Sequence, residues 1–290
     1  MCVMILMLLV TFSFMGCNYA EKETDDLSKI KAISMGEFHT VVLKENGTIL
    51  VWGDNEYGQC DVPKGLKNVK AISTGNYNTV VLKENGTVLV WGDNEYGQCD
   101  VPDGLNNVKA ISTGRHHVLA LKEDGTVVIW GKLVWQVPED LSNVKAISAM
   151  MSNSVALKED GTVVGSKYVP KDLSNVKAIS AGWGHTVALK EDGTVVAWGN
   201  NTKGQCDVPA DLNNVKEISA GFSHTVVLKE DGTVVAWGCN IYGKSDVPKD
   251  LNNVVTIFGG SDCTYALKDD GTFVSWGDVD YDIFEELPYK

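Results

Sequence analysis

The chain has 290 residues, of which 44% are hydrophobic and 22% charged, an ordinary composition for a folded protein. Its formal charge of -13, from 25 basic and 38 acidic residues, repels nucleic acid and anionic lipid head groups. The composition therefore argues against a nucleic-acid partner and against binding to a charged membrane surface.

The N-terminus predicts export. The first 16 residues, MCVMILMLLVTFSFMG, carry no charge and are too short for a comfortable membrane span, which favours a signal peptide over residues 1–16. Phe14-Met15-Gly16-Cys17 resembles a bacterial lipobox, so Cys17 is the predicted lipidation site, although no Lys or Arg precedes the apolar run and Phe14 replaces the usual leucine. A plain cleaved signal or a misassigned start is the alternative. Residues 17–26 are a polar tether.

A repeat fills residues 27–290. Its seven units begin at residues 27, 66, 105, 141, 173, 212 and 251, with spacings of 39, 39, 36, 32, 39 and 39 residues. Self-similarity at a fixed period outweighs any domain count based on length. One repeat domain is therefore expected.

Each unit predicts four short strands. In the fifth unit, residues 177–180, 186–189 and 194–198 are β-branched or apolar runs of strand length. Asp192-Gly193 between the second and third runs supplies the positive φ angles of a tight hairpin turn, so these strands are antiparallel neighbours. A weaker fourth strand is expected at residues 205–208, ending at Pro209, which lacks an N–H and suits an outer edge.

The second and third strands are apolar on both faces, as expected when each small sheet is sandwiched between two others. Seven such sheets expose two apolar ends unless they close into a ring. The prediction is an all-β, seven-bladed β-propeller of four-stranded antiparallel blades, with an open β-solenoid as the alternative.

The repeat also resembles a known family. G-x-x-H-T-x-A-L, then D-G-x-V-x-x-W-G and G-Q, is similar to the repeat of the regulator of chromosome condensation family, whose members form seven-bladed β-propellers, and the resemblance covers residue 27 to about residue 288. The phrase G-T-V-V-A-W-G with V-P between units is most similar to bacterial, often exported, members of this superfamily. Leu287-Pro288 matches the Val-Pro of the other units, so a strand exchanged between the two ends is not evident.

Several residue sets that suggest chemistry are better explained as framework. One repeat position holds His39, His117, His185 and His224, but Asn78, Asn153 and Cys263 fill it in the other units, which argues against a metal site or a catalytic base. A recurrent tryptophan (Trp52, Trp91, Trp130, Trp198, Trp237 and Trp276) indicates packing between blades. Cys60, Cys99 and Cys206 share one repeat position and are too far apart to pair, so they are expected as free thiols. Residues 278–282 lack the glycine and the closing acid of a calcium loop.

The residues that vary are the candidates for recognition, because a repeat framework fixes packing and leaves its loops free. Alternating strand directions bring the G-x-x-H turns and the loops after W-G to one face. Aromatic residues scattered around such a face are typical of a protein interface. The candidate partner-binding residues are Glu37, Phe38, Tyr57, Asn76, Tyr77, Tyr96, Arg115, His116, Trp135, Trp183, Phe222 and Tyr242.

Two units lose length on this face. Unit 3 drops three residues and reads Lys132-Leu133-Val134-Trp135, while unit 4 drops seven and lacks its tryptophan. This predicts a notch beside Trp135. Two interpretations stay open: a binding notch, or ordinary repeat decay with Trp135 covering the gap.

These observations favour a non-catalytic binding protein with no cofactor. It is expected to be a monomer in the cell membrane or on the cell surface of a bacterium, held by a lipid anchor alone or else secreted, with a protein, peptide or glycan partner on one propeller face. The resemblance also implies two alternatives: a guanine-nucleotide exchange factor, as the eukaryotic founder of the family is, or an inhibitor of a secreted or cell-wall enzyme, as the type II β-lactamase-inhibitory protein is. No G-x-S-x-G, H-E-x-x-H or phosphate-loop pattern supports an enzyme.

Overall fold

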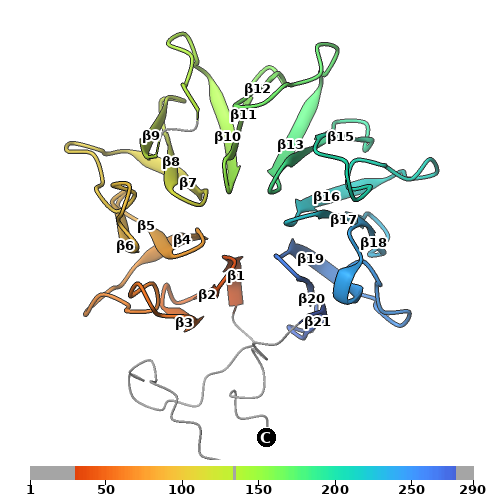
Figure 1. Ribbon diagram of the computed structural model, residues 1–290, viewed down its shortest axis with the longest axis horizontal. Helices are drawn as coiled ribbons and strands as arrows, with labels where there is room; N and C mark the ends of the chain where they lie inside the picture. Colours follow the sequence, from red (N-terminus) through yellow and green to blue (C-terminus); the bar gives the residue numbers. More distant parts are fainter. Residues whose placement is uncertain (1–29, 133–134, 279–290) are drawn as a thin grey trace, which may run out of the picture.

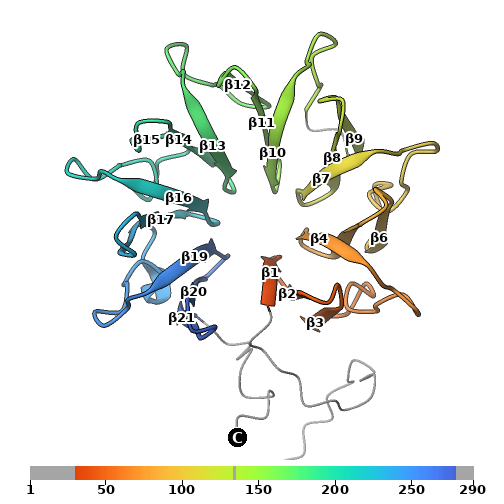
Figure 2. The same ribbon diagram turned by 180° about the vertical axis from the view of Figure 1, so that it is seen from behind.

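The computed structural model describes residues 30–132 and 135–278. Within these ranges the chain forms seven antiparallel sheets, here called blades 1 to 7, each made of three consecutive strands. The blades follow one another around a common centre, with the first strand of each blade nearest that centre (Figures 1 and 2).

The strands are β1 (Ile30–Met35), β2 (His39–Lys44) and β3 (Ile49–Gly53) in blade 1; β4 (Val69–Thr74), β5 (Asn78–Lys83) and β6 (Val88–Gly92) in blade 2; β7 (Val108–Thr113), β8 (His117–Lys122) and β9 (Val127–Gly131) in blade 3; β10 (Val144–Met150), β11 (Asn153–Lys158) and β12 (Val163–Gly165) in blade 4; β13 (Val176–Ala181), β14 (His185–Lys190) and β15 (Val195–Gly199) in blade 5; β16 (Val215–Ala220), β17 (His224–Lys229) and β18 (Val234–Gly238) in blade 6; and β19 (Val254–Gly259), β20 (Cys263–Lys268) and β21 (Phe273–Gly277) in blade 7. A 3-10 turn, η2 (Ile241–Gly243), follows β18. In the described residues no helix is long and apolar enough to cross a membrane.

The first three of the four strands predicted in each unit are confirmed, and the hairpin between the second and third is as expected. In blade 5 the pairing runs from His185 opposite Gly199 to Leu189 opposite Val195. The turn glycine, Gly193, has a φ of 80°. This value lies in the region that glycine adopts without steric cost, which is why the Asp-Gly or Asn-Gly pair recurs.

The predicted fourth strand is wrong. Residues 205–208 form part of a turn rather than a ladder. The backbone N–H of Cys206 donates to the Asn201 side chain at 2.8 Å, and that of Val208 donates to the Cys206 carbonyl at 2.9 Å. Because the loop uses its own backbone donors in this way, none of these groups is left to extend the sheet.

The hydrophobic core lies between the blades rather than inside them. Six clusters of buried side chains each span the boundary between two consecutive blades, here called a seam. At the seam of blades 2 and 3, Val80 and Leu82 pack against Val118, Ala120 and Trp130. The middle strand is buried on both faces, as its sequence predicts, and the recurrent tryptophan contributes to packing between blades.

The last blade faces the first across an open cavity of about 220 Å³, which both blades line. The closing segment predicted at Leu287-Pro288 lies outside the described residues.

Candidate functional site

One rim of the molecule collects the variable turns and loops. His39 pairs with Gly53, so the turn before β2 and the loop after β3 leave the same end of the blade. The backbone N–H of Asp54 donates to the Phe38 carbonyl at 2.8 Å and joins turn to loop. We call this end, in all seven blades, the loop rim, and the end with the Asp-Gly or Asn-Gly turns the hairpin rim.

The loop after the third strand is held in shape by hydrogen bonds among its own residues, and we call this arrangement the loop frame. In blade 1 the side chain of Asn55 accepts the N–H of Cys60 at 2.8 Å and donates to Asp61 at 2.9 Å. The buried Gln59 side chain accepts the N–H of Tyr57 at 2.9 Å. The Asn–Asp bond recurs in blades 2, 5 and 6 at 2.9, 2.7 and 2.9 Å. The frame is constant, while the position it displays varies among Tyr57, Tyr96, Lys203 and Tyr242.

Aromatic side chains on the loop rim meet in three groups. Phe38 stacks on Tyr77 with ring centroids 4.8 Å apart and an interplanar angle of 12°. Tyr57 tilts against the same Tyr77 ring at 4.8 Å, so one group joins blades 1 and 2.

The second group pairs Tyr96 with His116, whose ring centroids lie 4.6 Å apart. The third stacks Trp183 of blade 5 on Phe222 of blade 6 at 4.8 Å and 5°. Each contact crosses a seam, so neighbouring blades build these groups jointly.

The predicted site residues differ in exposure. Tyr57, Tyr96, Trp183 and Tyr242 are 47, 38, 39 and 62% exposed. Arg115 is also exposed, while Glu37, Phe38, Tyr77, His116 and Phe222 are half-buried. Asn76 is only 5% exposed and donates to the carboxylate of Glu37, so it supports the rim from below.

Trp135 is the clearest departure from the predicted binding set. It is 6% exposed and packs among Leu119, Leu121 and Ala156 at the seam of blades 3 and 4. Blade 4 has Ser166 where the other units have a tryptophan. Trp135 therefore supplies the indole that this seam would otherwise lack, which agrees with the repeat-decay interpretation of the shortened loops rather than with a binding notch.

The recurrent histidines lie buried beneath the loop rim, where they contact the next blade; we call this set the histidine floor. His39, His185 and His224 approach the threonine hydroxyls of the next blade through Nε2 at 2.9, 3.1 and 2.8 Å, and His117 approaches a serine hydroxyl at 2.8 Å. The hydroxyl of Thr79 donates its proton to the Gln59 carbonyl at 2.8 Å. In the bond between His39 and Thr79, His39 must therefore be the donor, through Nε2. Burial lowers the pKa of His39, His117 and His185 to about 4 and that of His224 to about 3. These side chains are neutral framework groups, as expected.

The buried Gln of each G-Q motif links loop and seam. The Gln59 carbonyl also accepts the indole N–H of Trp91 at 3.0 Å, and the equivalent bonds from Trp130 to Gln98 and from Trp237 to Gln205 measure 3.0 and 3.1 Å. In blade 6, Lys244 replaces the glutamine and pairs with Asp262 at 2.9 Å. The loop of blade 1 is thus joined to the next blade by two hydrogen bonds, one from a threonine hydroxyl and one from a tryptophan indole.

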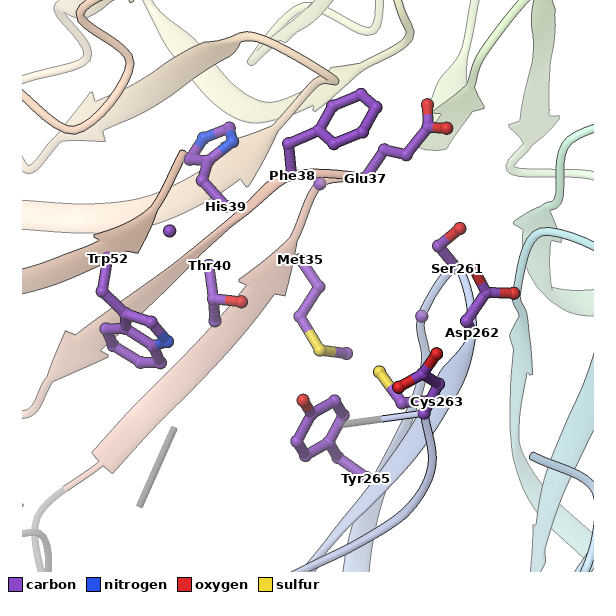
Figure 3. Close-up of a pocket in the computed structure, with 14 residues that line it drawn as sticks. Met35, Glu37, Phe38, His39, Thr40, Trp52, Ser261, Asp262, Cys263 and Tyr265 are labelled. Atoms are coloured by element: carbon purple, nitrogen blue, oxygen red, sulfur yellow. The ribbon is translucent and has the colours of Figure 1, made fainter. Parts of the chain in front are cut away.

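The cavity between blades 7 and 1 opens beside the first aromatic group. Met35, Cys263 and Tyr265 reach into the space between the blades, and Glu37 and Asp262 lie at one end of it (Figure 3). Burial raises the pKa of Glu37, opposed by Arg115. The buried indole N–H of Trp52 has no partner among the described residues.

Nucleophilic and metal chemistry find little support in the described part of the chain. None of Cys60, Cys99, Cys206, Cys239 and Cys263 forms a disulfide bond within the described residues. Burial raises the pKa of Cys99 to about 12 and that of Cys206 to about 11, which disfavours the reactive thiolate. No group of three or more His, Cys, Asp or Glu side chains is placed to hold a metal ion in these residues. Cys17 lies outside the described residues, and so do residues 279–282, which make up most of the segment compared with a calcium loop.

Sequence reasoning missed two residues of the rim. Lys132 lies over the Tyr96 ring, with its Nζ 4.6 Å from the centroid, and Ile241 is 54% exposed beside Tyr242. Comparing the residue that follows W-G in each unit would have singled out Lys132, because blades 1, 2 and 7 carry an aspartate there.

The fold and the repeated motif define a β-propeller of three-stranded blades. The model of the regulator of chromosome condensation (RCC1) repeat matches residues 30–59, 69–98, 108–132, 176–205 and 215–244. The chain therefore belongs to the RCC1 repeat family. The comparison with curated protein sequences gives no match.

Solved structures with the same fold include proteins from plants, animals and fungi. The ectodomain of the Physcomitrella patens receptor kinase CR4 is 19% identical, with a TM-score of 0.71 over 86% of this chain and 73% of that chain. Human WBSCR16 is 19% identical, with a TM-score of 0.66 over 81% and 85%. Prp20p of Saccharomyces cerevisiae is 22% identical, with a TM-score of 0.52 over 86% and 72%. At these identities the likeness concerns the fold alone.

Proposed function

We propose that this chain is a non-catalytic protein-binding propeller that holds its partner on the loop rim. The observation that carries the proposal is the set of exposed and half-buried aromatic rings that the G-x-x-H turns and the hydrogen-bonded loops after the third strands present together on the loop rim. Rigid aromatic side chains on a prearranged surface lose little conformational entropy on binding and give large contact areas.

A protein partner suits this rim better than a small glycan. The rings lie on blades 1, 2, 3, 5 and 6, so a single occupant must span several blades. Stacking also covers one face of Phe38, Tyr77, Trp183 and Phe222, which leaves edges as well as faces for contact. A broad partner surface can use all of these groups together.

Other propellers with this fold offer a parallel. The structure of Prp20p was described together with its binding properties to Gsp1p and histones, and Kap60 has been seen bound to yeast RCC1. Regulation of a GTPase and inhibition of an enzyme are both special cases of protein binding. No described residue of this chain favours either one over the general proposal.

The test is capture of a partner from secreted and surface proteins by the full chain and by the triple variant Phe38→Ala, Tyr77→Ala, Phe222→Ala. We expect the variant to lose capture and to keep a cooperative unfolding transition. A control on the hairpin rim, Glu123→Ala with Glu159→Ala, should bind normally. If the triple variant captures its partner as well as the unchanged chain does, the loop rim is not the binding surface.

We further propose that the chain is exported and anchored through Cys17, on the strength of the apolar run that ends in Gly16-Cys17. Cys17→Ser should move the protein from the membrane fraction to the soluble fraction of its host. Unchanged fractionation would rule out the lipid anchor.

A further inference from the structure

Blades 1 and 2 present two tyrosines in the same setting. Tyr57 and Tyr96 occupy equivalent positions in their loop frames, and each tilts against the ring that follows from the next blade. Tyr57 meets Tyr77 at 4.8 Å and 53°, and Tyr96 meets His116 at 4.6 Å and 54°. Any difference between the two sites must therefore come from what surrounds the rings.

The chain itself supplies a cation to one of them. Lys132 follows the third strand of blade 3, where its backbone N–H donates to the His116 carbonyl at 2.8 Å. Its Nζ lies 4.6 Å from the centroid of Tyr96, within the range of a favourable cation–π contact. This geometry shows that a tyrosine in this frame accepts an ammonium group.

At the other tyrosine the same backbone position carries the opposite charge. Asp93 donates its backbone N–H to the Tyr77 carbonyl at 2.8 Å, as Lys132 does to His116. Its carboxylate accepts the N–H of Glu95 at 3.0 Å and the side-chain amide of Gln98 at 2.8 Å, two neutral donors. Among the described residues no lysine or arginine pairs with Asp93 or lies over Tyr57.

The neighbouring charges add to this difference. Burial raises the pKa of Tyr77, and the carboxylates of Glu37 and Asp54 raise it further, while Arg115 lowers it. Glu56 is exposed beside Tyr57. Because Tyr57 packs against Tyr77, the carboxylates that act on Tyr77 also make the surroundings of Tyr57 negative, which favours an incoming cation over an uncharged group.

We propose that Tyr57 is a cation-accepting position, which receives a lysine or arginine side chain of the bound partner over its ring with Asp93 as the counter-ion. The partner segment at blades 1 and 2 is therefore basic. This inference rests on the proposed function, and it specifies the chemistry of the partner where that proposal names only the rim.

The site can be tested with a small probe, before any partner is known. The full chain, with isotope-labelled tyrosine rings, is titrated with N-acetyl-arginine methylamide and, as a matched neutral probe, N-acetyl-citrulline methylamide. We expect the ring signals of Tyr57 to shift with the arginine probe and to shift little with citrulline. Tyr96, already covered by Lys132, should respond less.

Reciprocal variants exchange the two sites. Asp93→Lys should place an internal ammonium over Tyr57 and abolish the shift, and Lys132→Asp should make Tyr96 respond as Tyr57 does. Asp93→Asn keeps the acceptor that Asn200 provides in blade 5, and it should weaken the probe about two- to fivefold. The loop frame does not depend on this carboxylate, because blade 6 has Cys239 at the same position and keeps its Asn240–Asp246 bond.

Equal responses to arginine and citrulline, or a Tyr57 shift that survives in Asp93→Lys, would overturn the inference. The outcome is separable from that of the proposed function. Partner capture that persists without any arginine preference leaves the binding rim standing and removes the cation site. A selective Tyr57 response in a chain that captures no partner supports the cation site and argues against the binding rim.

Discussion

The same strands build both rims of this propeller, and each rim contains residues that recur from blade to blade. The physical reason for this recurrence differs between the two rims. On the hairpin rim the exposed Asp192 accepts both the backbone N–H and the hydroxyl of Thr194, at 3.0 and 2.6 Å, and blades 3 and 4 repeat this turn. On the loop rim the recurrent histidine and glutamine side chains are buried, while varying positions such as Tyr57 and Trp183 are exposed. Constancy at an exposed position thus indicates turn chemistry, whereas variation above a constant buried frame indicates recognition.

Acid should separate the two rims, with the largest effect that we expect. A histidine whose folded pKa is about 4, against 6.5 when unfolded, contributes full stability above pH 6.5 and loses it as the pH falls toward 4. Each loss is on the order of 2 to 3 kcal/mol, so several together match the whole stability of a typical domain.

The hairpin rim has the same sign of dependence and a different window. The hydroxyl and N–H of Thr126 hold the pKa of Asp124 at about 2, so its contribution is present above pH 3.8 and is lost as the pH falls toward 2.

The histidine effect is tested by urea unfolding between pH 7 and pH 4. The urea midpoints should fall from about pH 6.5 downward, and less steeply in His117→Asn. Midpoints that stay constant down to pH 5 would contradict the histidine floor.

A pair of tryptophan variants tests which ring belongs to the core. Trp135→Ala removes a buried indole from the seam of blades 3 and 4 and should cost about 3 to 5 kcal/mol of unfolding free energy. Trp183→Ala, at an exposed loop-rim position, should cost far less and should weaken partner capture instead. Urea unfolding of both variants is the measurement, and equal stability losses would refute the distinction.

The histidine floor can be broken at a single seam. His117→Ala leaves the Ser154 hydroxyl without its partner at 2.8 Å and opens a cavity, for a loss of about 2 to 3 kcal/mol. His117→Asn is the matched control, because Asn153 at the equivalent place donates to Thr186 at 2.9 Å in the next seam. We expect the asparagine variant to retain more stability in urea than the alanine variant. The reverse order would mean that ring volume, rather than hydrogen bonding, matters at this position.

Much of the fold was predictable because the packing repeats with the sequence. The strand runs, the Asp-Gly turns and the recurrent His117 and Trp130 positions each need only a local pattern and a period. The fourth strand was not predictable in this way. Residues 205–208 have strand-like composition, but their backbone donors bond to Asn201 and within the loop, a competition that no alternation of residue types reveals.

The candidate site was predictable in location and less so in its members. The antiparallel strand order placed Tyr57 and Trp183 on one rim, and the structure brings their ring partners Tyr77 and Phe222 into contact. For Trp135 the sequence left open a place in the binding surface or in the packing of the shortened loops, because an indole suits a core and an interface equally well. Only the missing tryptophan at Ser166, one blade later, distinguishes the two.

The smallest effect is expected on the hairpin rim itself. Asp192→Ala removes the acceptor for both Thr194 bonds, but the turn is exposed and Gly193 still supplies its positive φ, so the urea midpoint should shift less than in any variant above. Asp192→Asn should be close to the unchanged chain, because Asn46 and Asn85 accept the equivalent N–H at 3.0 and 3.1 Å in blades 1 and 2. Partner capture should be unaffected in both. A binding loss in Asp192→Ala would mean that the hairpin rim, despite its uniformity, takes part in recognition.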